Sequence, residues 1–285
     1  MGIAKGKQSL QDRVTQQWVI LTGKKINTED FSWLLGPFGE TDGIGDRFIQ
    51  DLAKKEGLRI DTVEINKGLI QSINQLNLRK EELSILPLSI VDFYENTSNY
   101  HLELRVKWNP FFKIFGVLLR LIFSKRIQQL NVPLQNSKDS DELTNQIIHL
   151  KDKKTDEVKR TIWLRKIKST AQVVYSGVYE TCILPSGQAC VKAIFPLPNG
   201  SATVILTPKV TDKGHLILES SGKEIGDSGF YFLLSDSNDQ LWAKFIKSFK
   251  DTLILKEVND GILATQKLTI WGLRLVEFEY KINKK

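Results

Sequence analysis

The stretch VYSGVYETCILPSGQACVKAIF, residues 174–195, predicts a β-hairpin that closes around a Pro-Ser-Gly turn. Cys182 and Cys190 lie symmetrically about Ser186, so the hairpin would place them opposite each other. Directly paired strand residues approach closely enough for a disulfide. In a reducing cytoplasm we instead predict two free thiols that pack as small apolar side chains.

The flanking sequence has the same character. Residues 147–167 predict a second hairpin with a charged loop, and Asn199-Gly200 is a strong hairpin turn signal. The last two strands are predicted at 262–270 and 273–282. Further turns are predicted at 212–214, 226–229 and 259–261. Short strands at this spacing predict an antiparallel barrel or sandwich over residues 141–285.

The N-terminal residues 1–140 have a different pattern and predict a mostly helical region. Helices are expected over 9–22, 46–58 and 64–76, with Gly57 as a C-terminal stop for the second. Residues 100–108 alternate between apolar and charged side chains, which predicts a strand with one solvated face that joins the larger sheet. The predicted fold class is therefore α+β, with a helical N-terminal half, an antiparallel β-rich, barrel- or sandwich-like C-terminal half, and a domain boundary near residue 140.

The most apolar stretch of the chain is NPFFKIFGVLLRLIFSKR, residues 109–126. An Asn-Pro pair suits a helix start, and the pattern predicts a helix over 110–129. Lys113 and Arg120 fall on one narrow polar stripe, and they leave too few uncharged residues between them for a membrane span. Three roles remain for this helix: packing in the core, lining an apolar cavity, or lying on an anionic membrane surface.

The positive charge is concentrated around the same helix. The chain has a formal net charge of +7. Six cations and no acid lie between positions 105 and 126, namely Arg105, Lys107, Lys113, Arg120, Lys125 and Arg126. A local basic excess favours an anionic partner. Because these cations lie on an apolar helix rather than among exposed aromatic residues on a sheet, nucleic acid is not favoured.

The leading hypothesis is a non-catalytic protein that binds an apolar or lipid-like ligand, or an anionic membrane surface. Its helix would line or close a cavity in the β half. The predicted binding residues are Trp108, Phe111, Phe112, Phe115, Leu119, Arg120, Phe123, Lys125 and Arg126.

Two alternatives remain open. One is an enzyme whose acids, Asp42 and Asp46, act at the mouth of a pocket, and the other is a structural protein-interaction module. The sequence contains no phosphate-binding loop, no defensible catalytic triad and no metal-ligand spacing, so no cofactor and no metal is predicted. Residues 1–25 lack an export signal, which predicts a cytoplasmic protein, with a peripheral membrane location if the helix binds lipid.

Overall fold

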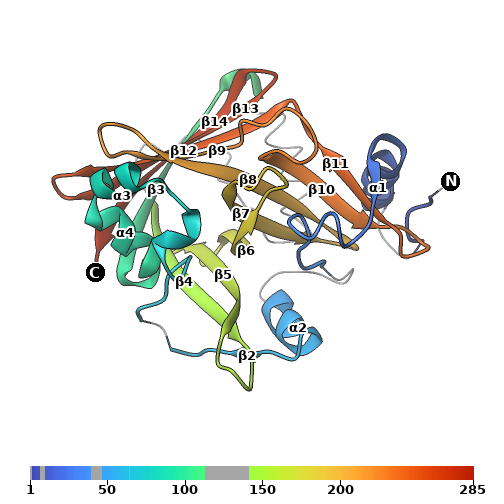
Figure 1. Cartoon of the computed structure of the whole chain (residues 1–285), viewed down its shortest axis with the longest axis horizontal. Helices are drawn as coiled ribbons and strands as arrows, with labels where there is room; N and C mark the ends of the chain where they lie inside the picture. Colours follow the sequence, from blue (N-terminus) through green and yellow to red (C-terminus); the bar gives the residue numbers. More distant parts are fainter. Residues whose placement is uncertain (1, 7–9, 40–46, 64, 113–140) are drawn as a thin grey trace.

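The computed structural model describes residues 2–6, 10–39, 47–63, 65–112 and 141–285, and is dominated by one 14-stranded sheet (Figure 1). Ten strands form a closed ring, and the others extend or flank it. In ring order these are β8 (Gly200–Val210), β7 (Ala189–Leu197), β6 (Val173–Ile183), β5 (Val158–Ile167), β4 (Asp141–Lys151), β3 (Tyr100–Trp108), β14 (Leu273–Lys284), β13 (Gly261–Ile270), β12 (Phe249–Val258) and β9 (Leu216–Glu219).

The ring closes because one edge of β8 has two partners. Residues 200–205 of β8 pair with β10 (Gly229–Ser235), whereas residues 207–210 pair with β9. Beyond β10 the sheet continues through β11 (Leu241–Phe245) to β1 (Lys24–Ile26), and β2 (Arg59–Ile60) pairs with β4. All these strand pairs are antiparallel, so the ring is an antiparallel barrel with a short extension that diverges from it at β8.

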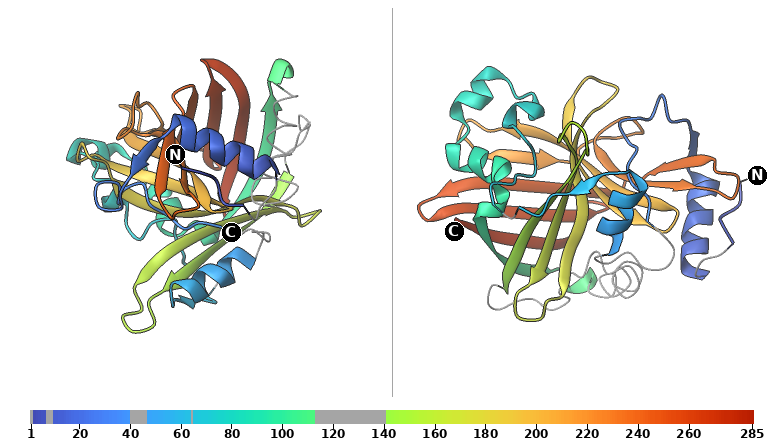
Figure 2. Two further views of the ribbon diagram at one scale, coloured as in Figure 1. Left: turned by 90° about the vertical axis from the view of Figure 1, so that its right-hand side faces the viewer. Right: turned by 90° about the horizontal axis from the view of Figure 1, so that it is seen from below.

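The helices lie at the two ends of the barrel and on its outside. They are α1 (Leu10–Thr22), α2 (Arg47–Lys55), α3 (Lys80–Ile85) and α4 (Leu88–Glu95), with 3₁₀ turns η1 (Ile73–Leu76), η2 (Thr97–Asn99) and η3 (Pro110–Phe112). Figures 1 and 2 show α3 and α4 at one end and α1 at the opposite end. Phe93 and Tyr94 of α4 belong to the same apolar core as the inward faces of the strands, so α4 covers that end of the barrel.

The segment from β1 to β2 covers part of the barrel's outer surface. Trp33 and Leu34 pack on outward residues of β6, β7 and β8, while Phe48 and Leu52 of α2 pack on outward residues of β4 to β7. The outward apolar side chains of these strands are thus buried by the N-terminal chain, and the inward ones face the barrel interior.

The barrel confirms the antiparallel β prediction, and the helical N-terminal half is confirmed only in part. α1 and α2 lie where helices were expected, and Gly57 follows α2 with a left-handed φ of 68°. The predicted helix over 64–76 is wrong, since only its end forms the turn η1. Gly68 lies so close to the end of α4 that a Cβ would be 2.3 Å from the carbonyl oxygen of Glu95. The segment around Gly68 therefore packs against the end of α4 and is not helical.

Strand β3 occupies the predicted residues 100–108 and pairs with β14 and β4 in the common sheet. Of the predicted helix 110–129, only the short turn η3 lies within the described residues. The boundary near residue 140 lies in the undescribed range 113–140, so the division into two domains stays a prediction.

Candidate functional site: a cavity inside the barrel

The barrel encloses a cavity of about 320 Å³. Its wall follows the two-residue alternation of the strands, because every second side chain points inward. Trp163 and Arg165 come from β5, Asp251 and Leu253 from β12. The other lining residues are almost all apolar and come from β3, β6 to β10, β13, β14, α1 and α4. The cavity is therefore the inner face of the barrel, left unfilled at its centre.

The cavity extends toward the point where β9 and β10 diverge. β12 pairs with β9 through residues 252–255, and residues 249–251 of β12 lie beyond that pairing. Here the wall is formed by aromatic rings: Phe230 lies 5.0 Å from Phe249 and 5.1 Å from Phe232. Trp18 of α1, 42% exposed, contacts Phe232 edge-on and also lines the cavity. The described part of the cavity wall thus reaches the surface beside α1.

Arg165 is the one cation among the lining residues that the structure describes. It is 6% exposed, and its guanidinium carbon lies 4.2 Å from the ring centroid of Trp163, 4.3 Å from Tyr175 and 5.3 Å from Tyr280. Its Nε has no hydrogen-bond partner, and Arg165 forms no ion pair within the described residues. Aromatic faces attract a cation, but they do not accept its N–H hydrogens in the way an oxygen does.

Asp251 is the one acid in the described part of the cavity wall, and it is 4% exposed. Its carboxylate accepts hydrogen bonds from Gln266 Nε2 at 2.8 and 3.0 Å. Burial raises the pKa of Asp251 to about 7, and the bonds from Gln266 only partly oppose that shift. No cation lies within ion-pair distance of Asp251 in the described chain. The cavity therefore holds two charged side chains of opposite sign that do not pair with each other.

Several tyrosine hydroxyls are further polar groups of the wall, beside the amide of Gln266. Burial raises the pKa of Tyr94, Tyr175 and Tyr179 above the usual value, so these hydroxyls stay protonated at neutral pH. The site offers a large apolar surface, one guanidinium group, one carboxyl group and several neutral hydroxyls. That composition suits the recognition of an apolar molecule with a polar end.

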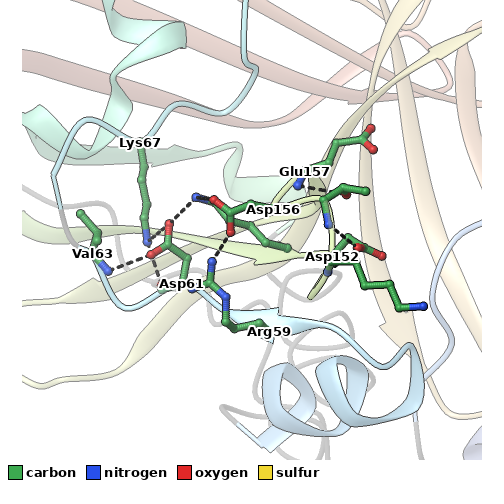
Figure 3. Close-up of polar contacts among 10 residues, drawn as sticks. Arg59, Asp61, Val63, Lys67, Asp152, Asp156 and Glu157 are labelled. Atoms are coloured by element: carbon green, nitrogen blue, oxygen red, sulfur yellow. Dashed lines mark hydrogen bonds and ion pairs between the residues drawn. The ribbon is translucent and has the colours of Figure 1, made fainter.

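A second polar cluster lies outside the barrel, where β2 meets the β4–β5 hairpin (Figure 3). Lys67 is buried and donates to the carbonyl of Asp61 at 2.8 Å, and Lys151 pairs with Asp61 at 3.2 Å and with Asp156 at 3.5 Å. Arg59 also pairs with Asp156. Because every charged group in this cluster faces an opposite charge or a backbone oxygen, we interpret it as an anchor for residues 59–67.

The two cysteines are paired in register between β6 and β7, as predicted, and both are free thiols. Burial raises the pKa of Cys182 to about 12 and also raises that of Cys190. Within the described part of the chain no group of histidine, cysteine, aspartate and glutamate side chains is arranged to hold a metal ion.

The predicted site residues are only partly covered by the description. Trp108 is buried at the end of β3 and does not line the cavity, while Phe111 in η3 is 92% exposed. Phe112 is the last residue of η3. Phe115, Leu119, Arg120, Phe123, Lys125 and Arg126 lie outside the described residues, as do Asp42 and Asp46, so their roles stay predictions.

Arg165 and Asp251 were not among the residues predicted from the sequence. The available signal was local: Trp163 and Arg165 are two apart in IWLRKI, which places the arginine on the same strand face as a large aromatic residue. The alternation does not say which of the two faces points into the barrel, because β5 is covered on both sides.

The fold and site define a closed antiparallel β-barrel with an internal, mainly apolar cavity. The chain matches no protein-family profile and no solved structure. It is 22% identical over 269 residues to the "Uncharacterized membrane protein YndJ" of Bacillus subtilis (strain 168). That match covers 93% of this chain and 46% of the relative, so the chain spans about half the length of the curated relative it matches. Among the described helices, none has the length and apolar character needed to cross a membrane.

Proposed function

We propose that this protein binds an apolar or lipid-like ligand inside its barrel and catalyses no reaction on it. The observation that carries the proposal is the closed barrel around a cavity of about 320 Å³ with an almost wholly apolar lining. Small-molecule pockets commonly span about 300–1,000 Å³, so the cavity is at the lower end of that range. Each ligand methylene moved from water into such a site contributes roughly 0.8 kcal/mol.

Native mass spectrometry of the purified protein tests this proposal directly, because a ligand acquired during expression adds a discrete mass. Binding of dodecanol by the delipidated protein is the second measurement. Ala264 lines the cavity, and its neighbour Thr265 on β13 points to the other face of the strand. We expect Ala264→Phe to weaken dodecanol binding at least about tenfold by occupying the cavity, and Thr265→Phe to leave it within about twofold.

The outcomes separate cleanly. No copurified mass, together with no binding of dodecanol or of any charged amphiphile of similar length, would overturn the proposal. Equal binding by both phenylalanine variants would place the ligand outside the barrel and would also contradict it.

We infer a second candidate function, docking on an anionic membrane surface. Phe111 is 92% exposed at the start of the cationic apolar stretch, which suits insertion of a ring among lipid head groups. The name of the distant relative also contains the word membrane. Sedimentation with phosphatidylserine vesicles tests it: Lys125→Gln with Arg126→Gln should reduce binding, whereas Lys213→Gln with Lys223→Gln, on exposed turns, should not. Equal binding to neutral phosphatidylcholine vesicles would contradict it.

Three further hypotheses stay predictions. A cytoplasmic location, an acidic catalytic site at Asp42 and Asp46, and a purely structural interaction module are all compatible with a barrel of this kind. The cavity favours ligand binding over the last of these, because a module that only contacts other proteins has no need of an unfilled interior.

A further inference from the structure

Arg165 lines the mainly apolar cavity without a counter-ion among the described residues. The Arg165 guanidinium remains charged under all ordinary conditions, since its intrinsic pKa is above about 12. Burying such a charge is costly unless an anion or several acceptors face it. In the described structure Arg165 has three aromatic rings and no oxygen partner, while its side chain lines the cavity.

Other cations of this barrel have oxygen partners. Lys192, 4% exposed, pairs with Glu180 at 3.2 Å and donates to the carbonyl of Leu35 at 2.7 Å. Arg160, which is only partly buried, pairs with both Glu56 and Glu180. Cations on the outer face of the barrel thus have oxygen partners, whereas the described residues supply none for Arg165 on the inner face.

Building on the ligand-binding function above, we propose that Arg165 receives the carboxylate head group of an amphiphile whose apolar chain fills the rest of the cavity. The proposal rests on the position of Arg165 in the wall, on its Nε, which has no hydrogen-bond partner among the described residues, and on the mainly apolar character of the remaining lining. The guanidinium carbon lies 4.2 Å from the ring centroid of Trp163 and 4.3 Å from that of Tyr175, and these rings accept none of its N–H hydrogens as an oxygen would. A guanidinium group can donate the paired hydrogen bonds that a carboxylate accepts.

The charge balance of the wall selects a singly charged head group. Among the described lining residues Arg165 is the one cation, and Asp251, whose pKa burial raises to about 7, is neutral below that pH. A phosphate dianion would therefore bring an excess negative charge into the barrel. An alcohol would leave the guanidinium charge uncompensated, and an ammonium group would add a second cation. Carboxylate matches both the charge and the planar geometry of a single arginine.

Isothermal titration with matched head groups tests the inference. The probes are octanoate, dodecanoate and hexadecanoate, each compared with the alcohol of equal chain length, and with dodecyltrimethylammonium for the middle length. We expect wild-type protein to bind the best-fitting carboxylate about 10- to 100-fold more tightly than its alcohol, as a charge-assisted hydrogen-bonded pair implies. Arg165→Met should abolish that preference while leaving alcohol binding within about threefold.

Two further variants sharpen the design. Arg165→Lys keeps the positive charge but loses the paired N–H donors of the planar guanidinium group. It should therefore retain only part of the preference for carboxylate over alcohol. Arg274→Gln is the matched control, because Arg274 lies on β14 with a side chain that is 52% exposed. It should bind every probe as the wild type does.

The results distinguish the inference from the function on which it rests. If alcohol and carboxylate bind wild-type protein equally, or if Arg165→Met retains the preference, the Arg165 inference is overturned and ligand binding stands. If no probe of any length or charge binds, the proposed function fails and the inference fails with it. Should Arg165→Met not fold, the wild-type head-group series and Arg165→Lys still decide the matter.

Discussion

Two buried cations on neighbouring parts of the barrel have opposite environments. Lys192 on β7 points outward under the loop that carries Trp33, where it meets the Glu180 carboxylate and the carbonyls of Trp33 and Leu35. Arg165 on β5 points inward and meets aromatic rings. Their exposed fractions, 4% and 6%, are almost the same. Burial alone therefore does not distinguish a structural cation from a binding one.

What differs is how many hydrogen-bond donors are satisfied. A cation whose donors all face oxygens contributes to the fold and has little capacity left for a ligand. A cation that faces only rings and an empty volume keeps its donors for something that enters. Substitutions at the two positions should therefore change different properties: stability at the outer position and ligand selection at the inner one.

The largest effect is expected for Lys192→Met. The substitution roughly keeps the side-chain length, but it removes the donor to one buried and one partly buried carbonyl and one partner of Glu180. We therefore expect a loss of about 3–5 kcal/mol in the free energy of unfolding. Chemical denaturation measures it. Lys209→Met is the control, since the Lys209–Glu219 pair is 2.6 Å long but half-exposed and should contribute less than about 1 kcal/mol. Similar losses of stability in both variants would show that the buried partners of Lys192 contribute no more than an exposed ion pair does.

An intermediate effect is expected for Asp251→Asn, which removes the unpaired acid of the cavity. With a pKa of about 7 in the folded state and 3.8 as its ordinary value, Asp251 binds a proton on folding between these pH values. The contribution of Asp251 to the free energy of unfolding is therefore most favourable below about pH 4. It becomes less favourable as the pH rises toward 7 and stays so at higher pH. The whole shift corresponds to about 4 kcal/mol.

The measurement is the difference in unfolding free energy between the variant and wild type at pH 5 and pH 8. Asp251→Asn should gain about 2–3 kcal/mol relative to wild type over that interval, because asparagine has no charge to bury. Asp260→Asn, on the exposed turn between β12 and β13, controls for other titrating groups. A variant that loses stability relative to wild type as the pH rises would show that Asp251 has an unseen cationic partner.

The sequence predicted the strand order of the hairpins better than it predicted the interior. Turn residues such as Asn199-Gly200, and the symmetrical cysteines around Ser186, fix local pairing, and the structure confirms both. Closure of the barrel depends on β8 sharing one edge between β9 and β10, which is a long-range contact without a local signal. The same holds for Gly68, whose packing against Glu95 replaced the expected helix.

The site was harder to predict for a related reason. Apolar residues and cations in 109–126 drew attention because they are adjacent in sequence, whereas Arg165 and Asp251 come from strands far apart in the chain. Each belongs to an ordinary strand pattern, and only the curvature of the sheet brings them to one cavity. An isolated inward charge is visible only when both faces of its strand can be assigned.

The smallest effect on stability, and the most direct check of the comparison, is expected for Arg165→Met. Removing the guanidinium loses contacts with the rings of Trp163, Tyr175 and Tyr280, worth roughly 0.5–2 kcal/mol in total, but also removes a buried charge without an oxygen partner. The two changes oppose each other, so we expect the unfolding free energy of the ligand-free protein to stay within about 1 kcal/mol of wild type. Denaturation of delipidated samples measures it beside Lys192→Met. A loss as large as that of Lys192→Met would show that Arg165 is held by the fold as firmly as the outer lysine, and that its donors are not reserved for a ligand.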